Sequence, residues 1–450
     1  MTDNAIDTML NELHLKQRQD RICAAGLKND AAFQAALAQE NPPLWKDFRA
    51  PPVSIELQHS LAEKLYNAEK GDTALINLGD GSRHIGPWLV EKCRKEGIPF
   101  VVQFSDANFM NLALNHASDE GVRNLAANFL ALTAPVTTII TARSGMQEHD
   151  VPVDPQKDLL YRRETKPYGD RLRSGDLFYT LTVIPTPVDA QIDHFAYDDY
   201  IKLFFEMCDQ PWNHISTAQK ALIGEFNTAR TVRITNDDGT DVSMELVDND
   251  GLHFTFCNSL IAKNVPGSEI FSAPRRDSVN GTVVAKGRFE HNHNLIEDLT
   301  MEFKDGKLVS YSAAKNVAAF ERAIAADSGA KYVGELGIGT NPHLNKHVAN
   351  GLLVEKIGGS FHLALGASYS YTSYEGEPVK VNNGNQSALH WDITTMLRGR
   401  GGKIYLDDRL VMDNGLWLDP RYKVLNEGWK AIPKNVRPEY WKNYDQFNCG

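Results

Sequence analysis

The sequence has few cysteines, five in 450 residues, and no two of them are spaced as CxxC. Their odd number and scattered positions exclude a disulfide-stapled scaffold and a cysteine-ligated zinc module, and they predict reduced thiols. No apolar run approaches the about 18 to 20 residues of a membrane-spanning helix, and the first residues carry acids instead of the basic stretch of a secretion signal. These absences predict a soluble, cytoplasmic protein with no membrane partner.

An excess of positive charge is also missing. The chain has 47 Lys+Arg against 58 Asp+Glu, a net charge of −11, and no long basic run. This balance argues against a protein that binds the phosphate backbone, so no nucleic-acid partner is expected. Hydrophobic residues make up 42% and charged residues 23%, which is typical of a globular chain; at roughly 150 residues per domain, the length predicts two to three domains.

The first half of the chain predicts an α/β domain with an open, mostly parallel sheet over residues 56–227. Buried apolar strands are expected at 73–78 and 98–104, with a helix at 85–95 between them, and this succession is typical of a parallel βαβ unit. Gly79-Asp80-Gly81 follows the first strand, but it matches no nucleotide motif, so we interpret it as a strand-to-helix turn. Further strands are predicted at 136–141 and 177–184, and helices at 118–132 and 195–208.

After residue 227 the pattern changes to short strands separated by Asp-Gly turns, which predicts a β-rich α+β domain over residues 228–418. Residues 1–55 are predicted to form a helical extension, and residues 419–450 an irregular tail. Within the second domain, strands are expected at 231–235, 242–247, 253–257, 281–286 and 307–312, and a helix at 317–326.

Candidate metal ligands gather in this second domain. His390 and Asp392 flank Trp391, and in a strand two residues so spaced point to one face, where both can address one ion. The HxD pattern is also common by chance. His362 lies in an apolar run, where a hydrogen-bonded core histidine is the alternative interpretation.

Two glutamates complete the candidates. Glu335 stands among glycines and aliphatic residues, and burying a carboxylate costs several kcal/mol unless it is paired or on a metal. For Glu269, an exposed acid in a surface loop is the alternative interpretation. Taken together, the three carboxylates and two imidazoles suit two divalent ions that share bridging carboxylates and a hydroxide.

The segments around these residues resemble a known family. The blocks NVPGSEIFSAP, GELGIGTNP, GGSFHLALGASY and NQSALHWD are similar, in order and spacing, to the signatures of the aminopeptidase T / aminopeptidase S family of metalloaminopeptidases. The resemblance covers roughly residues 70–418. It implies an α/β N-terminal domain, a β-rich catalytic domain and a homodimer. It also implies two divalent metal ions on Glu269, Glu335, His362, His390 and Asp392.

The activity implied by the resemblance is metal-dependent removal of N-terminal residues from peptides, by a hydroxide that two metals activate. Zinc is the first metal expected, with cobalt or manganese as alternatives. Glu335 is expected to bridge the metals or to carry a proton, and Tyr369 to donate a hydrogen bond to the oxyanion. A tyrosine that only packs the wall of the site is the alternative for Tyr369.

Two other functions stay open. A mononuclear non-haem iron, ring-cleaving dioxygenase on the same scaffold needs only His362, His390 and Asp392, and a non-catalytic binding protein needs none of them. The metal content of the purified protein distinguishes the three hypotheses. Other paired histidines favour no site: His291 and His293 lie in a polar segment, and His343 and His347 lack the glutamate of an HExxH motif.

Overall fold

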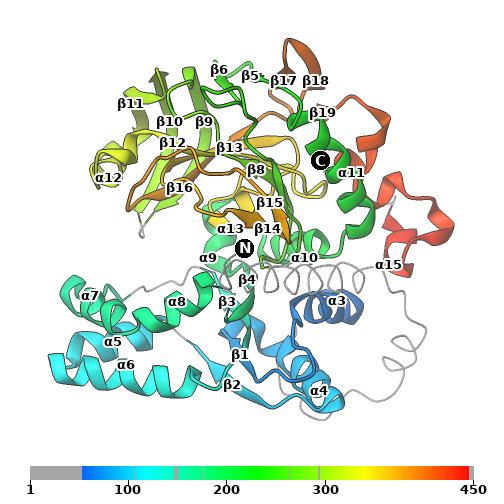
Figure 1. Ribbon diagram of the computed structural model, residues 1–450. Coiled ribbons are helices and arrows are strands. Elements are labelled where there is room, and N and C mark those ends of the chain that lie inside the picture. The colour runs from blue at the N-terminus through cyan, green and yellow to red at the C-terminus, as the bar shows by residue number, and fades with distance from the viewer. Residues whose placement is uncertain are drawn as a thin grey trace. The chain divides into compact units, whose positions relative to one another are not determined.

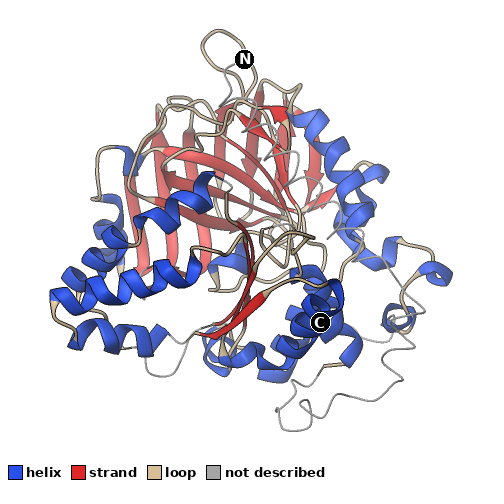
Figure 2. Cartoon of the chain, turned by 60° about the horizontal axis from the view of Figure 1, so that its bottom comes forward, coloured by secondary structure: helices blue, strands red, loops and turns tan. Residues whose placement is uncertain are grey.

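The computed structural model describes residues 53–105, 107–145, 151–174, 176–261, 263–291 and 294–444. The chain divides into two compact units, of which the first comprises Met1–Asp209 with Ala262–Val265 and the second Gln210–Ile261 with Pro266–Gly450 (Figures 1 and 2). The helical extension predicted for residues 1–55 lies almost wholly outside the described residues. No helix among the described residues combines the length and the apolar character needed to cross a membrane.

The first unit is built on a four-stranded, all-parallel sheet in the order β2-β1-β3-β4, which confirms the predicted α/β domain with an open parallel sheet. Its strands are β1 (Ala74–Leu78), β2 (Phe100–Phe104), β3 (Thr138–Ser144) and β4 (Phe178–Ile184). The helices are α3 (Ile55–Leu65), η2 (Asp80–Ile85), α4 (Gly86–Glu96), α5 (Ala107–His116), α6 (Asp119–Thr133), α7 (Pro155–Glu164), α8 (Lys166–Ser174), α9 (Pro187–Ile192) and α10 (Tyr197–Cys208).

One prediction for this sheet is wrong. The segment 98–104 was expected to be a buried strand, but β2 pairs only with β1, so it forms an edge of the sheet. Its apolar side chains remain partly in solvent, and Phe104 is 57% exposed. A strand with an apolar sequence is fully buried only when another strand pairs with it on each side. A strand at the edge of a parallel sheet lacks one of these two neighbouring strands.

The second unit contains an eight-stranded antiparallel sheet in the order β11-β10-β9-β6-β5-β17-β18-β19. Its strands are β5 (Thr231–Thr235), β6 (Asp241–Glu245), β9 (Asn280–His291), β10 (Asn294–Lys304), β11 (Lys307–Lys315), β17 (Lys403–Leu406), β18 (Arg409–Asp413) and β19 (Leu416–Trp417). This meander confirms the β-rich domain predicted from the Asp-Gly turns. Helices α11 (Trp212–Phe226) and α12 (Val317–Ile324) belong to the same unit, so the second unit begins before α11, whereas the predicted boundary at 227 follows this helix.

A second, five-stranded antiparallel sheet of this unit has the order β16-β13-β12-β8-β7. The strands are β7 (Cys257–Ser259), β8 (Glu269–Ser272), β12 (Val333–Gly339), β13 (Ser360–Gly366) and β16 (His390–Met396). The strand predicted at 253–257 is wrong, because His253 makes only an isolated bridge to Val247 and the strand β7 begins at Cys257. The smaller elements are β14 (Ser373–Tyr374), β15 (Glu377–Pro378), η3 (Gly329–Lys331) and α13 (Gly351–Val354).

The chain from residue 419 to residue 444 is more ordered than the irregular tail predicted for residues 419–450. It forms short helical turns, and its aromatic side chains Tyr422, Trp429 and Trp441 are buried. These rings supply the apolar area that holds the turns against the second unit. The elements are η4 (Pro420–Tyr422), α14 (Lys423–Glu427), η5 (Gly428–Ala431), η6 (Lys434–Val436) and α15 (Glu439–Lys442).

The five-stranded sheet has one apolar face. Leu336, Phe361 and Ile393 lie on this face, one on each of three neighbouring strands, and all three are fully buried. On the same face, Trp391 stacks on His291 of the larger sheet, with ring centroids 4.5 Å apart. Because side chains alternate along a strand, burying this face in the core directs the residues between them to the opposite face.

Candidate metal centre

The predicted metal ligands lie on that opposite face. Strand β8 contributes Glu269, β12 Glu335 and β13 His362, and β16 contributes both His390 and Asp392. All four strands are neighbours in one antiparallel sheet, so residues remote in sequence become adjacent across the strands.

The strand register places a small residue beside each ligand. Gly339 faces Glu269, Gly337 faces His362, and Ala364 faces Asp392. A Cβ atom built on Gly337 would lie 2.0 Å from Nε2 of His362, so only glycine there lets the imidazole ring lie over β12. Gly337 of the GELGIG segment therefore makes room for the ring of His362.

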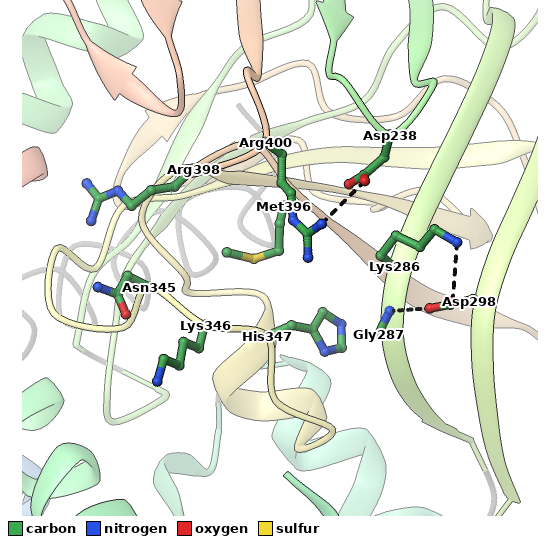
Figure 3. Close-up of a pocket in the computed structure, with 10 residues that line it drawn as sticks. All are labelled: Asp238, Lys286, Gly287, Asp298, Asn345, Lys346, His347, Met396, Arg398 and Arg400. Atoms are coloured by element: carbon green, nitrogen blue, oxygen red, sulfur yellow. Dashed lines mark hydrogen bonds and ion pairs between the residues drawn. The ribbon is translucent and has the colours of Figure 1, made fainter. Parts of the chain in front are cut away.

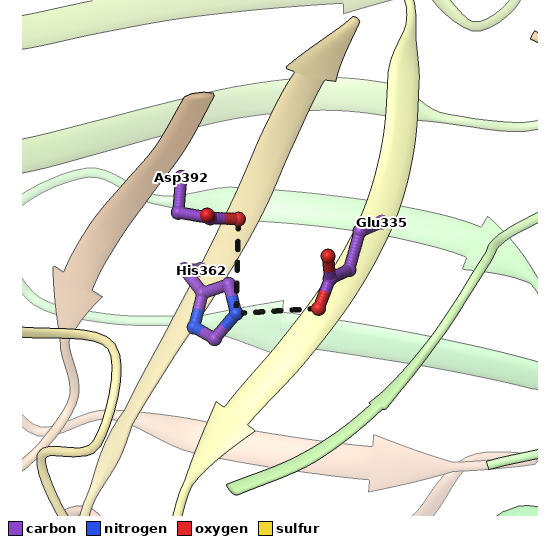
Figure 4. Close-up of side chains that lie close together, drawn as sticks. All are labelled: Glu335, His362 and Asp392. Carbon is purple, nitrogen blue, oxygen red and sulfur yellow. Dashed lines mark ion pairs between the residues drawn. The ribbon is translucent and has the colours of Figure 1, made fainter. Parts of the chain in front are cut away.

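Three of these side chains converge closely. One ligand atom from each of Glu335, His362 and Asp392 lies within 4.8 Å of the other two (Figure 4). His362 Nε2 lies 3.7 Å from Oε1 of Glu335 and 3.9 Å from Oδ1 of Asp392. It also lies 3.5 Å from Oε2 of Glu269, which brings the fourth predicted ligand to the same point.

The fifth predicted ligand, His390, completes the group from its exposed side. Its Nε2 lies 3.2 Å from Oε2 of Glu335 and 3.7 Å from Oδ2 of Asp392. Its other ring nitrogen, Nδ1, lies 2.8 Å from the backbone carbonyl oxygen of Ala367. Such a carbonyl accepts a hydrogen bond from Nδ1–H and leaves Nε2 as the nitrogen that faces a metal.

The charged groups of the centre shift one another's pKa values. Burial raises the pKa of Glu335, but its interactions with His362 and His390 outweigh burial and lower it to about 2. Burial lowers the pKa of each imidazole, yet Glu335 and Asp392 outweigh it, so that the value for His362 is about 9 and for His390 about 10. Burial, and then the charges of Glu355 and Glu335, raise the pKa of Asp392 to about 7. Both imidazoles are therefore protonated at neutral pH until a cation replaces their protons.

Two charged residues that the sequence analysis missed adjoin the centre. Lys356 Nζ lies 2.5 Å from Oε1 of Glu269 and 2.9 Å from Oε2 of Glu355, and its side chain is only 1% exposed. Burial works to lower the pKa of Lys356, but the two carboxylates outweigh it and raise the value. The lysine thus fixes one oxygen of Glu269 and leaves Oε2 toward His362. Its only sequence signal is its position six residues before His362.

Tyr369 follows β13 in a loop, not in a helix. Its ring lies 5.5 Å from that of His390 and 5.0 Å from that of Phe271, measured between centroids. Burial, and then the charges of Glu335 and Asp392, raise the pKa of the phenol well above its usual value. Tyr369 therefore keeps its proton at neutral pH and is available as a hydrogen-bond donor.

The donor set fits divalent metal ions. One oxygen each of Glu269, Glu335 and Asp392 is buried without a hydrogen bond in good geometry, and each faces the imidazole of His362 or His390, the groups that would give up their protons to a metal. Buried carboxylate oxygens without partners are costly unless a cation lies against them. Carboxylates with imidazoles suit zinc, cobalt or manganese.

The remaining histidine pairs do not join this group. His343 and His347 lie in a loop between β12 and α13, not on a helix, and His343 packs against Trp441 with ring centroids 5.5 Å apart. His291 stacks on Trp391, and His293 is outside the described residues.

Comparison with known proteins identifies the family. The family model described as Thermophilic metalloprotease (M29) matches residues 58–417, most of the chain. The chain belongs to this family. This membership confirms the resemblance to aminopeptidases T and S, and the matched residues belong to both units.

Individual relatives are more distant. Aminopeptidase 2 of Geobacillus stearothermophilus is 26% identical over 228 residues, 46% of this chain and 53% of the relative. Aminopeptidase T of Thermus aquaticus is 29% identical over 167 residues, 34% of this chain and 40% of the relative. The chain thus spans about half or less of the length of these curated relatives.

Solved structures support the fold. Wild-type AmpT from Thermus thermophilus superposes with a TM-score of 0.62 and 19% identity, covering 81% of this chain and 99% of that one. A 2,5-dihydroxypyridine dioxygenase from Pseudomonas putida KT2440 reaches a TM-score of only 0.49 at 15% identity, which is too weak to support the dioxygenase hypothesis.

Proposed function

We propose that this protein is a metal-dependent aminopeptidase that hydrolyses N-terminal residues from peptides. The observation that carries the proposal is the convergence of three carboxylates and two imidazoles on one face of a sheet, with carboxylate oxygens that lack hydrogen bonds. Membership of a metalloprotease family, and relatives named aminopeptidases, support it. The proposed metal ligands, for two divalent ions with zinc first, are Glu269, Glu335, His362, His390 and Asp392.

A divalent ion held by these residues would supply a Lewis acid for the scissile carbonyl and would lower the pKa of bound water toward about 7. The side chains of the protein provide the rest. The protonated phenol of Tyr369 donates a hydrogen bond to the oxygen that becomes negative in the transition state. Glu335, held between two imidazoles, would either bridge the metal ions or carry a proton during cleavage.

Metal analysis combined with peptide hydrolysis tests the proposal. We expect about two divalent ions per chain and release of the first residue from unmodified peptides, but none from N-acetylated peptides of the same sequence. Asp392→Ala should lose metal and hydrolysis together and keep the circular dichroism spectrum, because the core lies on the other face of the sheet.

Different results would point elsewhere. One iron per chain, with ring cleavage of a hydroxylated pyridine and no peptide hydrolysis, would support the dioxygenase. Full metal occupancy in Asp392→Ala would contradict the ligand assignment.

A further inference from the structure

The two histidines of the candidate metal centre differ in what holds their second ring nitrogen. Nδ1 of His390 lies 2.8 Å from the carbonyl oxygen of Ala367. Nδ1 of His362 is buried and has no hydrogen-bond partner among the described residues. Histidines that bind a metal almost always donate this N–H to an oxygen atom, which fixes the ring and its tautomer. His362 therefore lacks the contact that His390 has.

Strand β16 places a hydroxyl group opposite His362. Thr394 is the cross-strand neighbour of His362 in the pairing of β13 with β16. Residues directly opposite each other in an antiparallel pair point to the same face of the sheet, with Cβ atoms about 4.5–5.5 Å apart. Thr394 is also two residues after Asp392, so it lies on the face of the proposed metal ligands.

The hydroxyl of Thr394 is unpaired as well. The residue is fully buried, and its Oγ1 makes no hydrogen bond with any residue that the structure describes. Burying a hydroxyl without a hydrogen bond is unfavourable. An imidazole Nδ1–H is a donor and a hydroxyl oxygen is an acceptor, so these two unpaired atoms on facing residues complement each other.

Water in the neighbouring cavity does not supply a partner for this hydroxyl. A cavity of about 510 Å³ adjoins the end of β16, and Met396, two residues after Thr394, lines it (Figure 3). Thr394 does not belong to the lining, and its Oγ1 is buried. Ser360, which precedes His362 by two residues on β13, already donates a hydrogen bond of 2.8 Å to the carbonyl oxygen of Ile357.

The orientation of the ring agrees with a contact between His362 and Thr394. Figure 4 shows Nε2 of His362 directed toward Glu335 and Asp392, and the other ring nitrogen directed away from both. Nε2 is thus the atom that faces an ion, and Nδ1 is left for a contact within the sheet. Threonine can turn its hydroxyl toward such a contact by rotation about one bond, χ1.

We propose that Thr394 is a positioning residue of the metal centre. When a divalent ion is bound, Oγ1 of Thr394 accepts a hydrogen bond from Nδ1–H of His362 and keeps Nε2 directed at the ion. The inference rests on the proposed function and its metal ligands, and it adds to them a residue that touches no ion itself. Removing such a partner of a metal-binding histidine typically lowers metal affinity by about 10–100-fold.

Thr395 offers a matched control, because it is the next residue of the same strand. It is also buried, and its Oγ1 likewise makes no hydrogen bond with a described residue. Its cross-strand neighbour is Phe361, on the apolar face of the sheet. Replacing either threonine by valine keeps the branched shape and removes an unpaired hydroxyl, so neither change should destabilise the metal-free protein.

Zinc binding by the full chain, measured by competition with a chelating dye, tests the proposal. We expect Thr394→Val to weaken binding by about tenfold or more, and Thr394→Ser, which keeps the hydroxyl, to bind nearly as tightly as the unmodified protein. Thr395→Val should bind like the unmodified protein. Thermal unfolding without metal checks that each variant folds. If Thr394→Val does not fold, Thr394→Ser and Thr394→Ala make the same comparison, since they differ only in the hydroxyl.

The ring N–H of His362 gives a second readout, which a loss of packing alone would not move. In zinc-loaded protein labelled with ¹⁵N-histidine, Thr394→Val should shift the Nδ1–H signal of His362 upfield, because its hydrogen bond is lost. Thr395→Val should leave this signal in place.

The proposal is overturned if Thr394→Val binds zinc as tightly as the unmodified protein, if Thr394→Ser binds as weakly as Thr394→Val, or if Thr395→Val weakens binding equally. An unmodified protein that binds no zinc would overturn the ligand assignment and this proposal together, so the two failures are distinguishable.

Discussion

Gly337 illustrates how a residue without chemistry of its own shapes the centre. It has no side chain to bind a metal, but the ring of His362 occupies the place where a Cβ atom would project. The resemblance pointed to the proposed ligands because each of them lies in a local sequence block. It did not identify this role of Gly337, because the contact depends on the pairing of β12 with β13.

We expect Gly337→Ala to reduce metal content by at least about tenfold, because the added methyl displaces a buried imidazole that has little room to move. Gly224→Ala is the matched control: this glycine lies in α11 with nothing near its Cβ position, and alanine there should stabilise the helix. Elemental analysis and thermal unfolding measure both effects. Normal metal content in Gly337→Ala would show that the ring adjusts.

Tyr369→Phe removes only the phenolic hydroxyl. We expect kcat for peptide hydrolysis to fall by about 10²–10³, the usual cost of one oxyanion donor, with unchanged metal content. Tyr371→Phe is the control, since its more exposed ring stacks on Tyr369 with centroids 4.9 Å apart. A kcat near that of the unmodified protein would leave Tyr369 a packing residue.

The imidazoles predict a pH-dependent metal affinity. Because the pKa of His362 is about 9 and that of His390 about 10 without metal, binding a divalent ion at pH 7.5 should release about two protons. Calorimetry in buffers of different ionisation enthalpy measures this number, and His390→Ala should release about one fewer. The apparent affinity for the metal ion should rise with pH until the pH exceeds the pKa values of both histidines.

The same pKa shifts affect stability without metal in the opposite sense. A histidine whose pKa rises on folding stabilises the fold fully below its ordinary value near 6.5, and this contribution is lost as pH rises through about 9 to 10. Thermal unfolding of chelator-treated protein should therefore show a falling Tm over that range. A flat Tm would mean that the imidazoles are unpaired.

At the scale of elements, the sequence predicted long periodic segments and missed short ones. The parallel strands and α6 and α10 follow clear apolar patterns. Helix α9 has only six residues, and its signal is a capping box in which Thr186 and Asp189 exchange side-chain-to-backbone hydrogen bonds. Helix α7 has no buried residue, so hydrophobic periodicity gives no sign of it beyond the cap at Asp154 and the proline after it.

The turn between α13 and β13 carries Lys356, whose position depends on tertiary pairing alone. Lys356→Met should lower the free energy of unfolding by about 3–5 kcal/mol without metal, because it leaves the carboxylates of Glu269 and Glu355 without their buried cation. Saturating zinc should restore part of this loss by binding Glu269. Chemical denaturation measures both values.

Lys423→Met is the matched control for that variant, since its pair with Glu427 is exposed and contributes little. If Lys356→Met unfolds like Lys423→Met, Lys356 does not hold Glu269 in place.

At the scale of the whole molecule, the two units follow the change in sequence pattern, but their boundary at Asp209 cannot be read from the sequence. Helix α11 resembles the helices of the first unit in pattern, and only its contacts assign it to the second. One of them is the hydrogen bond that Gln219 donates to the carbonyl oxygen of Glu269. An isolated helix carries no mark of the sheet on which it packs.

The resemblance predicts a homodimer. Light scattering at micromolar concentration should give about twice the 50.2 kDa of one chain. The mass of a single chain, with hydrolysis intact, would show that a second copy is not needed for activity.

The register of the five-stranded sheet makes the metal centre a test of correct folding. Sliding β13 by one residue against β12 would turn His362 into the core and bring Phe361 or Leu363 to the face of the carboxylates. The strands concerned are separated by long stretches of chain, so their pairing is slow to form. Metal uptake during refolding should thus lag behind collapse and report the moment at which all four strands are aligned.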